Sequence, residues 1–178
     1  MPNWCSNTVL IKGQKEEIRN LTVFLTDDQS EFSFQKIDPC PEALNQASAP
    51  NRSEQNAAFN TKKYGAPDWY SWRVKNWGTK WNSDGASVEI QEADDEDTLI
   101  AIYNFSTAWS PPIPIYQKLA KMFPNTNIFV NYDESGVDFS GWRSYKNGEE
   151  TRAIEYDQSY YSINTFMDPD VHEVWEYL

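Results

Sequence analysis

Hydrophobic and polar positions in the first part of the chain change their period from strand to helix and back. A short apolar run over residues 7–13 predicts a strand, and apolar residues at helical spacing over 16–25 predict an amphipathic helix. Apolar residues then recur near a period of two over 32–37, just before Pro39 and Pro41. Because proline cannot donate to a β-ladder, we predict a second strand that ends at Pro39.

The next stretch is polar and is rich in Asn, Gln, Ser and Ala. We interpret it as the beginning of an exposed, aromatic-rich helical insertion that spans about 41–84. Within the insertion, Asp68 is a favoured N-cap residue and Gly78 is a favoured residue after the last helical turn. These two residues predict a short helix between them.

The second half of the chain is richer in strand patterns. An acidic turn at 94–97 separates two strands of a predicted hairpin, the second of which is apolar on both faces and is therefore expected to be central. A helix is predicted after Pro111 and Pro112, and Asn147-Gly148 is a strong signal for a tight hairpin turn. We predict strands near 87–91, 99–105, 128–132, 137–145 and 151–156, and a terminal helix after Asp168 that carries Val171, Val174 and Trp175.

This order of elements predicts an α+β protein with a ferredoxin-like β-α-β-β-α-β core. The sheet is expected to be mainly antiparallel, with helices on one face and a C-terminal β-meander as an extension. Nothing in the pattern indicates a flexible hinge, so we expect residues 1–178 to form a single domain.

Composition narrows the environment and the partners. The chain has 15 Lys and Arg against 27 Asp and Glu, a net charge of −12, which repels nucleic acid and anionic lipid and favours protein partners. Cys5 and Cys40 are the two cysteines, and the chain begins without a basic and apolar leader pattern. No apolar run approaches the length of a membrane span. We therefore expect a cytoplasmic protein that does not enter a membrane.

Four strings resemble one known family, the YubB-type ferredoxin-like domain family of plasmid- and phage-encoded proteins. They are Met1-Pro2-Asn3-Trp4-Cys5-Ser6-Asn7, Asn76-Trp77-Gly78-Thr79-Lys80-Trp81, Phe105-Ser106-Thr107-Ala108-Trp109-Ser110-Pro111-Pro112 and Tyr132-Asp133-Glu134-Ser135-Gly136-Val137-Asp138-Phe139-Ser140-Gly141. The resemblance implies a ferredoxin-like fold and a mobile-element setting. It carries over no catalytic residue, and two cysteines cannot supply the four thiolates of an iron-sulfur cluster.

The sign of the local charge reverses between Arg52 and Trp81. Six basic residues face two acidic ones there, which gives +4 and leaves −16 for the rest of the chain. Aromatic residues are interleaved with the basic ones, a composition suited to stacking and to cation–π contacts. The candidate binding surface that follows is Trp69, Trp72, Arg73, Lys75, Asn76 and Lys80.

A structural explanation competes with this hypothesis. Trp77 and Trp81 are also suited to anchoring the insertion to the core, while the basic residues pair with the acidic remainder of the chain. Helical spacing places Tyr70, Val74 and Trp77 on one face of the predicted helix, beside a face that carries Trp69, Trp72, Arg73 and Asn76.

Other clusters favour structural roles. The acidic run from Glu92 to Asp97 lacks the glycine and the closing glutamate of a calcium loop, and His172 has no second ligand at metal-binding spacing. Asp133, Glu134 and Asp138 flank a turn, but neighbouring strand residues point to opposite faces, so they make a poor acid and base pair. No phosphate loop, dinucleotide motif or nucleophile elbow is present, so we expect no cofactor and no metal.

These observations favour a non-enzymatic protein-binding module of a mobile element, with an acidic surface. The alternative is a single-stranded nucleic-acid or nucleotide binder that uses the basic aromatic stretch 62–81, because sheets of this topology can present aromatic side chains to bases. A hydrolase with an unrecognised carboxylate site is a more distant alternative.

Overall fold

A six-stranded sheet with the order β2-β3-β1-β4-β5-β6 organises the molecule. The computed structural model describes residues 2–93 and 95–158. Every neighbouring pair of strands in the sheet is antiparallel. The elements are β1 (Trp4–Gln14), α1 (Lys15–Leu25), α2 (Phe34–Ile37), α3 (Glu42–Asn45), α4 (Glu54–Tyr64), α5 (Trp69–Trp77), β2 (Asp84–Glu92), β3 (Thr98–Ala108), α6 (Ile113–Met122), β4 (Asn127–Glu134), β5 (Phe139–Lys146) and β6 (Glu149–Tyr156).

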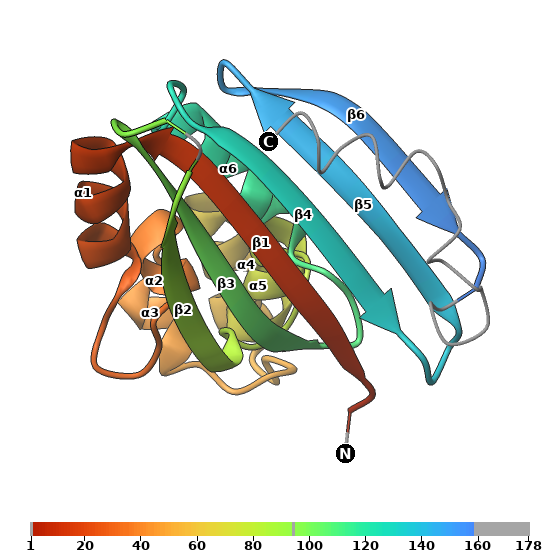
Figure 1. The fold of residues 1–178 in the computed structure, drawn as a ribbon. Helices are drawn as coiled ribbons and strands as arrows, with labels where there is room; N and C mark the ends of the chain where they lie inside the picture. The colour runs from red at the N-terminus through yellow and green to blue at the C-terminus, as the bar shows by residue number, and fades with distance from the viewer. Residues whose placement is uncertain (1, 94, 159–178) are drawn as a thin grey trace.

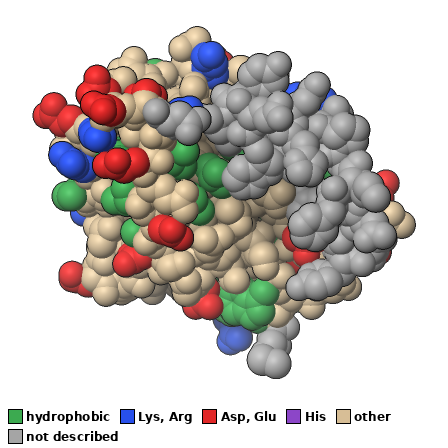
Figure 2. Space-filling model, viewed as in Figure 1, with side chains coloured by type: hydrophobic (Ala, Val, Ile, Leu, Met, Phe, Trp, Pro, Cys, Tyr) green, Lys and Arg blue, Asp and Glu red, His purple; other side chains and the backbone are tan. Residues whose placement is uncertain are grey.

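The helices all lie on one face of the sheet, as Figure 1 shows. Strand residues that point towards the helices, such as Val9 and Tyr103, form the main core with Ile18 of α1 and Leu119 of α6. All four side chains are fully buried. The fold therefore separates a helix-covered face from an opposite sheet face, which is the one seen in Figure 2.

The opposite sheet face carries a smaller apolar cluster. Leu10, Phe129 and Trp142 are buried there, and Ile102 and Ile154 pack against them. The rings of Phe129 and Trp142 have centroids 5.7 Å apart. Apolar residues on both faces explain why the middle strands read as continuous apolar runs in the sequence.

The strand predicted over 32–37 is wrong. The structure has the short helix α2 there, with Phe34 and Ile37 both buried. A spacing of three places these two side chains on the same side of one helical turn, so that both reach the core. The backbone N–H of Phe34 donates to the side-chain oxygen of Asn82 over 2.8 Å, which holds the start of this turn.

Most other predicted elements are present with shifted ends. β1 begins at Trp4 rather than at residue 7, because Trp4 to Ser6 continue the ladder with β3. α5 follows Asp68, whose carboxylate accepts from the N–H of Ser71, and it ends at Trp77, just before Gly78, which has a φ of 84°. α3 and α4 lie within the predicted helical insertion of about 41–84, but neither was predicted as a separate helix. The terminal helix predicted after Asp168 lies outside the described residues.

Candidate functional site

Three segments that are distant in sequence meet where β1 begins and β3 ends. The backbone N–H of Trp109 donates to the carbonyl oxygen of Asn3 over 3.0 Å. Thr79, in the loop after α5, donates from its hydroxyl to the carbonyl oxygen of Ala108 over 2.8 Å. The hydroxyl of Ser110 donates to the carbonyl oxygen of Gly78 over 2.6 Å. The loop after α5 is thereby fixed against this end of the sheet.

The same three segments expose tryptophan side chains. Trp4, Trp81 and Trp109 are 41 %, 38 % and 46 % exposed, which is unusual for such large apolar side chains. The ring centroids of Trp4 and Trp81 lie 6.2 Å apart, and Lys80 Nζ lies 4.0 Å from the centroid of the Trp81 ring. We call Trp4, Lys80, Trp81 and Trp109 the tryptophan surface. In Figure 2, hydrophobic side chains and a basic side chain gather at the lower edge of the molecule, where β1 begins.

The backbone of Trp109 adopts a conformation that bulky residues rarely adopt. Its φ is 74°, in the left-handed region. Such a conformation costs about 1–2 kcal/mol in a residue with a side chain. Unfavourable backbone conformations that persist are found more often at functional positions, so this one supports a role for the exposed indole.

A buried polar network lies at the same end of the sheet, on its helix-covered face. Asn7 donates from Nδ2 to the carbonyl oxygen of Cys5 and to Thr107 Oγ1, each over 2.9 Å, and accepts from the hydroxyl of Tyr116 over 2.8 Å. Thr107 in turn donates to the carbonyl oxygen of Ser110 over 2.8 Å. Burial raises the pKa of Tyr116 well above its ordinary range and that of the Cys5 thiol to about 12, so both groups stay neutral. The network therefore holds the turn at Trp109 without a buried charge.

The structure divides the six residues of the sequence-predicted surface. Trp72 is 7 % exposed and belongs to the main core, while Trp69 is half-buried beside it. The Arg73 guanidinium lies 5.1 Å from the centroid of the Trp69 ring and 4.9 Å from that of Trp77, and it donates to Asn45 Oδ1 over 2.9 Å. These three predicted residues come together, but as an internal stack that ties α5 to α3.

The other three predicted residues point in different directions. Asn76 donates to the carbonyl oxygen of Trp72 in its own helix over 2.8 Å, and Lys75 is exposed near the carbonyl oxygen of Gly65 at 3.5 Å. Only Lys80, which lies over Trp81, joins the tryptophan surface. The core-facing side of α5 is the Trp69 and Trp72 side, whereas Tyr70 and Val74 are exposed.

The amino-acid sequence was compared with models of known protein families. The family model described as the ferredoxin-like domain in Api92-like protein matches residues 76–168, more than half of the 178-residue chain. The chain belongs to this family. The matched part includes Lys80, Trp81 and Trp109 of the tryptophan surface, and Trp4 precedes it. The match supports a ferredoxin-like family, while the YubB name and the plasmid or phage setting stay predictions.

A solved structure has the same fold. The crystal structure of a protein api92 from Yersinia pseudotuberculosis aligns with a TM-score of 0.51 and 11 % sequence identity. The alignment covers 88 % of this chain and 98 % of that one. At this identity the likeness shows the fold alone. A search of curated proteins found no match.

Sequence reasoning missed Trp4 and Trp109 as site residues. Both lie within the strings that carried the family resemblance, directly beside the Asn3 and Ser110 contacts described above. Their signal was a tryptophan next to a turn-forming polar residue in each string. Exposure could not be read from those strings, because an isolated tryptophan in a strand pattern is usually buried.

Glu134 has a structural position in the turn between β4 and β5. Its side chain is buried and accepts from the backbone N–H groups of Gly136 and Val137 over 2.8 and 2.7 Å. A Cβ atom on Gly136 would lie 2.5 Å from Asn3 Nδ2, so the turn packs closely against the beginning of the chain.

Over residues 2–93 and 95–158, no group of three or more His, Cys, Asp or Glu side chains is placed to hold a metal ion.

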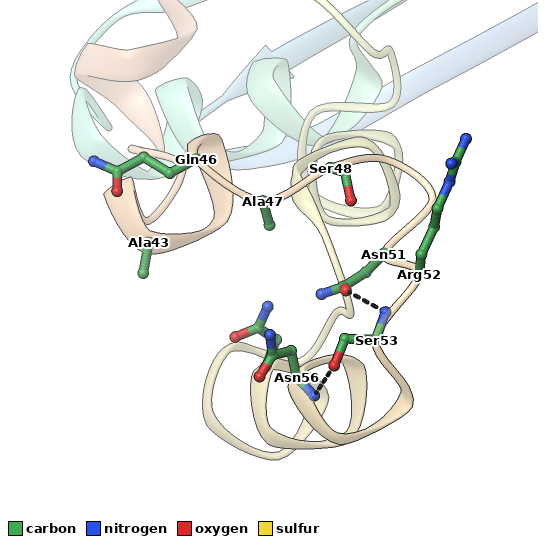
Figure 3. A pocket seen from close by; sticks show the side chains of 9 residues that line it. Ala43, Gln46, Ala47, Ser48, Asn51, Arg52, Ser53 and Asn56 are labelled. Carbon is green, nitrogen blue, oxygen red and sulfur yellow. Dashed lines mark hydrogen bonds between the residues drawn. The ribbon is translucent and has the colours of Figure 1, made fainter.

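A polar pocket of about 490 Å³ opens between α3 and α4 (Figure 3). Its amides largely support the surrounding chain: Asn51 and Asn60 both donate from Nδ2 to the carbonyl oxygen of Pro67. The N–H of Ser53 donates to Asn51 Oδ1 over 3.2 Å, and Ser53 Oγ caps α4 by accepting from the N–H of Asn56. The polar side chains that line the pocket are therefore used in hydrogen bonds that hold the chain around it in place.

Within the part of the chain that the structure describes, no helix is long and apolar enough to cross a membrane.

Proposed function

We propose that this protein is a non-enzymatic protein-binding module that docks its partner on the tryptophan surface. The supporting observation is the exposure of three tryptophans, Trp4, Trp81 and Trp109, at one end of the sheet. Tryptophan is the residue type most enriched among the side chains that dominate binding energy at protein interfaces. A partly exposed cluster of large apolar side chains is also a recognised mark of an interaction site.

Two further observations support binding rather than catalysis. The carboxylate of Glu134 is committed to two backbone N–H groups, and the Cys5 thiol has a pKa of about 12, which keeps it un-ionised and a poor nucleophile. The net charge of −12 favours a partner with basic groups. We infer a cytoplasmic, mobile-element setting from the sequence arguments above.

We also infer how the elements correspond to the family fold. On this proposal β1, α1, β2, β3, α6 and β4 make the β-α-β-β-α-β core, and β5 and β6 extend it as a meander. The segment of about 41–84 is then an insertion between α1 and β2. The insertion contributes Lys80 and Trp81 to the tryptophan surface, so it takes part in binding.

One observation favours the alternative, a single-stranded nucleic-acid or nucleotide binder. Lys80 lies over the exposed Trp81 ring, a pairing that suits a phosphate beside a stacked base. Trp72 and Arg73 contribute little to such a site because they are held inside the molecule. The negative net charge also opposes it, so protein binding is the stronger proposal.

The proposal is tested by selecting short displayed peptides on the wild-type protein and measuring their affinity by fluorescence polarisation. Trp4→Ala combined with Trp109→Gly should weaken the selected peptides about tenfold or more, which corresponds to about 1.4 kcal/mol or more. The matched control is Phe59→Ala with Tyr70→Ala, which removes two aromatic side chains that are 60 % and 47 % exposed elsewhere.

The proposal fails if selection enriches no peptide, or if the control variant loses as much affinity as the tryptophan variant. A labelled single-stranded oligonucleotide is titrated in parallel at low salt. Salt-dependent binding of the strand, lost on Lys80→Glu, would replace the proposal with the nucleic-acid alternative.

A further inference from the structure

A pocket of about 240 Å³ lies between the meander and the loop before α6. It is found at the same end of the sheet as the tryptophan surface, because Phe139 pairs with Glu134 where β5 begins and Pro111 follows Trp109 by two residues. The lining residues that matter here are Pro111, Tyr132, Phe139, Glu155, Tyr156 and Asp157.

Three of the seven residues that line the pocket are aromatic. Tyr132, Phe139 and Tyr156 come from three different strands, and the rings of Tyr132 and Phe139 pack edge to face with centroids 6.5 Å apart. Aromatic faces carry partial negative charge and attract cations within about 6 Å of the ring centroid. Tyr132 is only 2 % exposed, so the half-buried rings of Phe139 and Tyr156 are the ones that favour a cationic ligand with an apolar stem.

Carboxylates add negative charge to the same pocket. Glu155 accepts from the Tyr132 hydroxyl over 3.3 Å and also pairs with Arg143 Nη2. Arg143 bonds to Glu150 over 2.9 Å as well, so these two carboxylates outnumber the guanidinium between them. Asp157 is exposed at the rim. The balance of charge at the pocket is thus negative even after the Arg143 pairs are counted.

The Tyr132 hydroxyl keeps Glu155 in position over a wide pH range. Burial raises the pKa of Tyr132 to about 12, so its hydroxyl remains a donor to the Glu155 carboxylate near neutral pH. The side chain of Glu155 is 65 % exposed, which leaves it accessible to a ligand that approaches from solvent.

We propose that this pocket binds the cationic end of an arginine or lysine side chain from a protein partner. The inference rests on the proposed protein-binding function, because the pocket and the tryptophan surface lie at the same end of the sheet. Charge complementarity supports it, since the pocket combines aromatic walls with Glu155 and Asp157 in a chain of net charge −12. Specificity would come from the pocket, and the tryptophans would supply apolar contact area.

The test follows backbone amide resonances during titration with three short peptides that differ at one position: arginine, lysine or the uncharged norleucine. The arginine and lysine peptides should shift the amide resonances of Phe139 and Asp157 in a saturable way, and salt should weaken their binding. Glu155→Gln combined with Asp157→Asn should weaken both about tenfold. Asp157→Asn alone, which removes a charge from an exposed position, should weaken them to a smaller extent.

The matched control is Glu96→Gln with Asp97→Asn, which makes the same change in net charge at the exposed turn between β2 and β3. The proposal is overturned if this control weakens the peptides equally, or if the norleucine peptide produces the same shifts. Trp4→Ala should leave these short peptides unaffected. Binding of the arginine peptide together with a failed peptide selection would uphold the cation site and remove the protein-docking role of the tryptophans.

Discussion

The backbone N–H of Trp109 and the carbonyl oxygen of Asn3 form a 3.0 Å hydrogen bond that continues the β1–β3 ladder past its last residue pair. This bond and the Thr107 contact to Ser110 hold the turn in which Trp109 has φ of 74°. The chain thus keeps an indole exposed at a backbone position where glycine would be less strained.

Trp109→Gly is therefore expected to be more stable than Trp109→Ala by about 1 kcal/mol. Both variants remove the indole, but only alanine keeps the cost of a side chain in the left-handed region. Urea unfolding of the two variants under one condition measures the difference. Equal stabilities would show that the turn relaxes when the indole is removed.

Two buried tyrosines should respond in opposite ways to loss of the hydroxyl. Tyr116→Phe leaves the Asn7 side-chain oxygen without its donor and should lower the free energy of unfolding by about 1–2 kcal/mol. The Tyr103 hydroxyl is buried and has no hydrogen-bond partner among the described residues, so Tyr103→Phe should be neutral or stabilising. Thermal unfolding of the pair checks this, and a larger loss in Tyr103→Phe would contradict it.

Glu134→Gln should destabilise the protein by about 1–3 kcal/mol, because a carboxylate that accepts two N–H groups is replaced by an amide with one acceptor oxygen. Glu96→Gln, at an exposed turn, is the control and should change stability by less than about 0.5 kcal/mol. Chemical unfolding of the two variants gives both values. A fully stable Glu134→Gln protein would reopen the possibility that this carboxylate serves chemistry rather than the turn.

Stability should decline in alkaline solution. The pKa of Cys5 rises from 9.0 to about 12 in the folded protein, because burial disfavours the thiolate. The folded state therefore keeps a proton that the unfolded chain releases, so this contribution is fully present below pH 9.0 and is lost as pH rises towards about 12. Cys5→Ala should show a shallower decline than the wild type just above pH 9.0 when urea midpoints are compared under reducing conditions. Parallel declines would argue against a buried neutral thiol.

The sequence predicted elements best where period and capping residues agreed. The helix between Asp68 and Gly78 and the hairpin at Asn147-Gly148 follow from local chemistry alone, and both are present. The strand over 32–37 was predicted wrongly, because a run as short as Phe32, Phe34 and Ile37 fits a strand or one helical turn equally well. Only contacts from distant residues, such as Asn82, select the helical turn.

The candidate site was harder to predict because nearly every position of α5 is aromatic or long. Amphipathic spacing cannot identify the buried side when both sides are apolar, so Trp72 was assigned to a surface that the structure places in the core. Trp4 and Trp109 become a candidate site only through the pairing of β1 with β3, which joins residues more than a hundred positions apart. Sequence spacing alone contains no sign of that neighbourhood.

Among the residues that the structure describes, the sheet ends in β2 on one side and in β6 on the other. Unpaired edge strands invite two copies to join their ladders, which begins aggregation. Here both edges are lined with carboxylates, at Asp84, Glu89 and Glu92 on β2 and at Glu149, Glu150 and Glu155 on β6. Lys15 pairs with Glu92, and Arg143 pairs with Glu150 and Glu155, so part of this charge is compensated. The remaining negative charge should still oppose edge-to-edge contact between molecules near neutral pH. Acidification, which neutralises the carboxylates, should remove that barrier and allow self-association that light scattering detects.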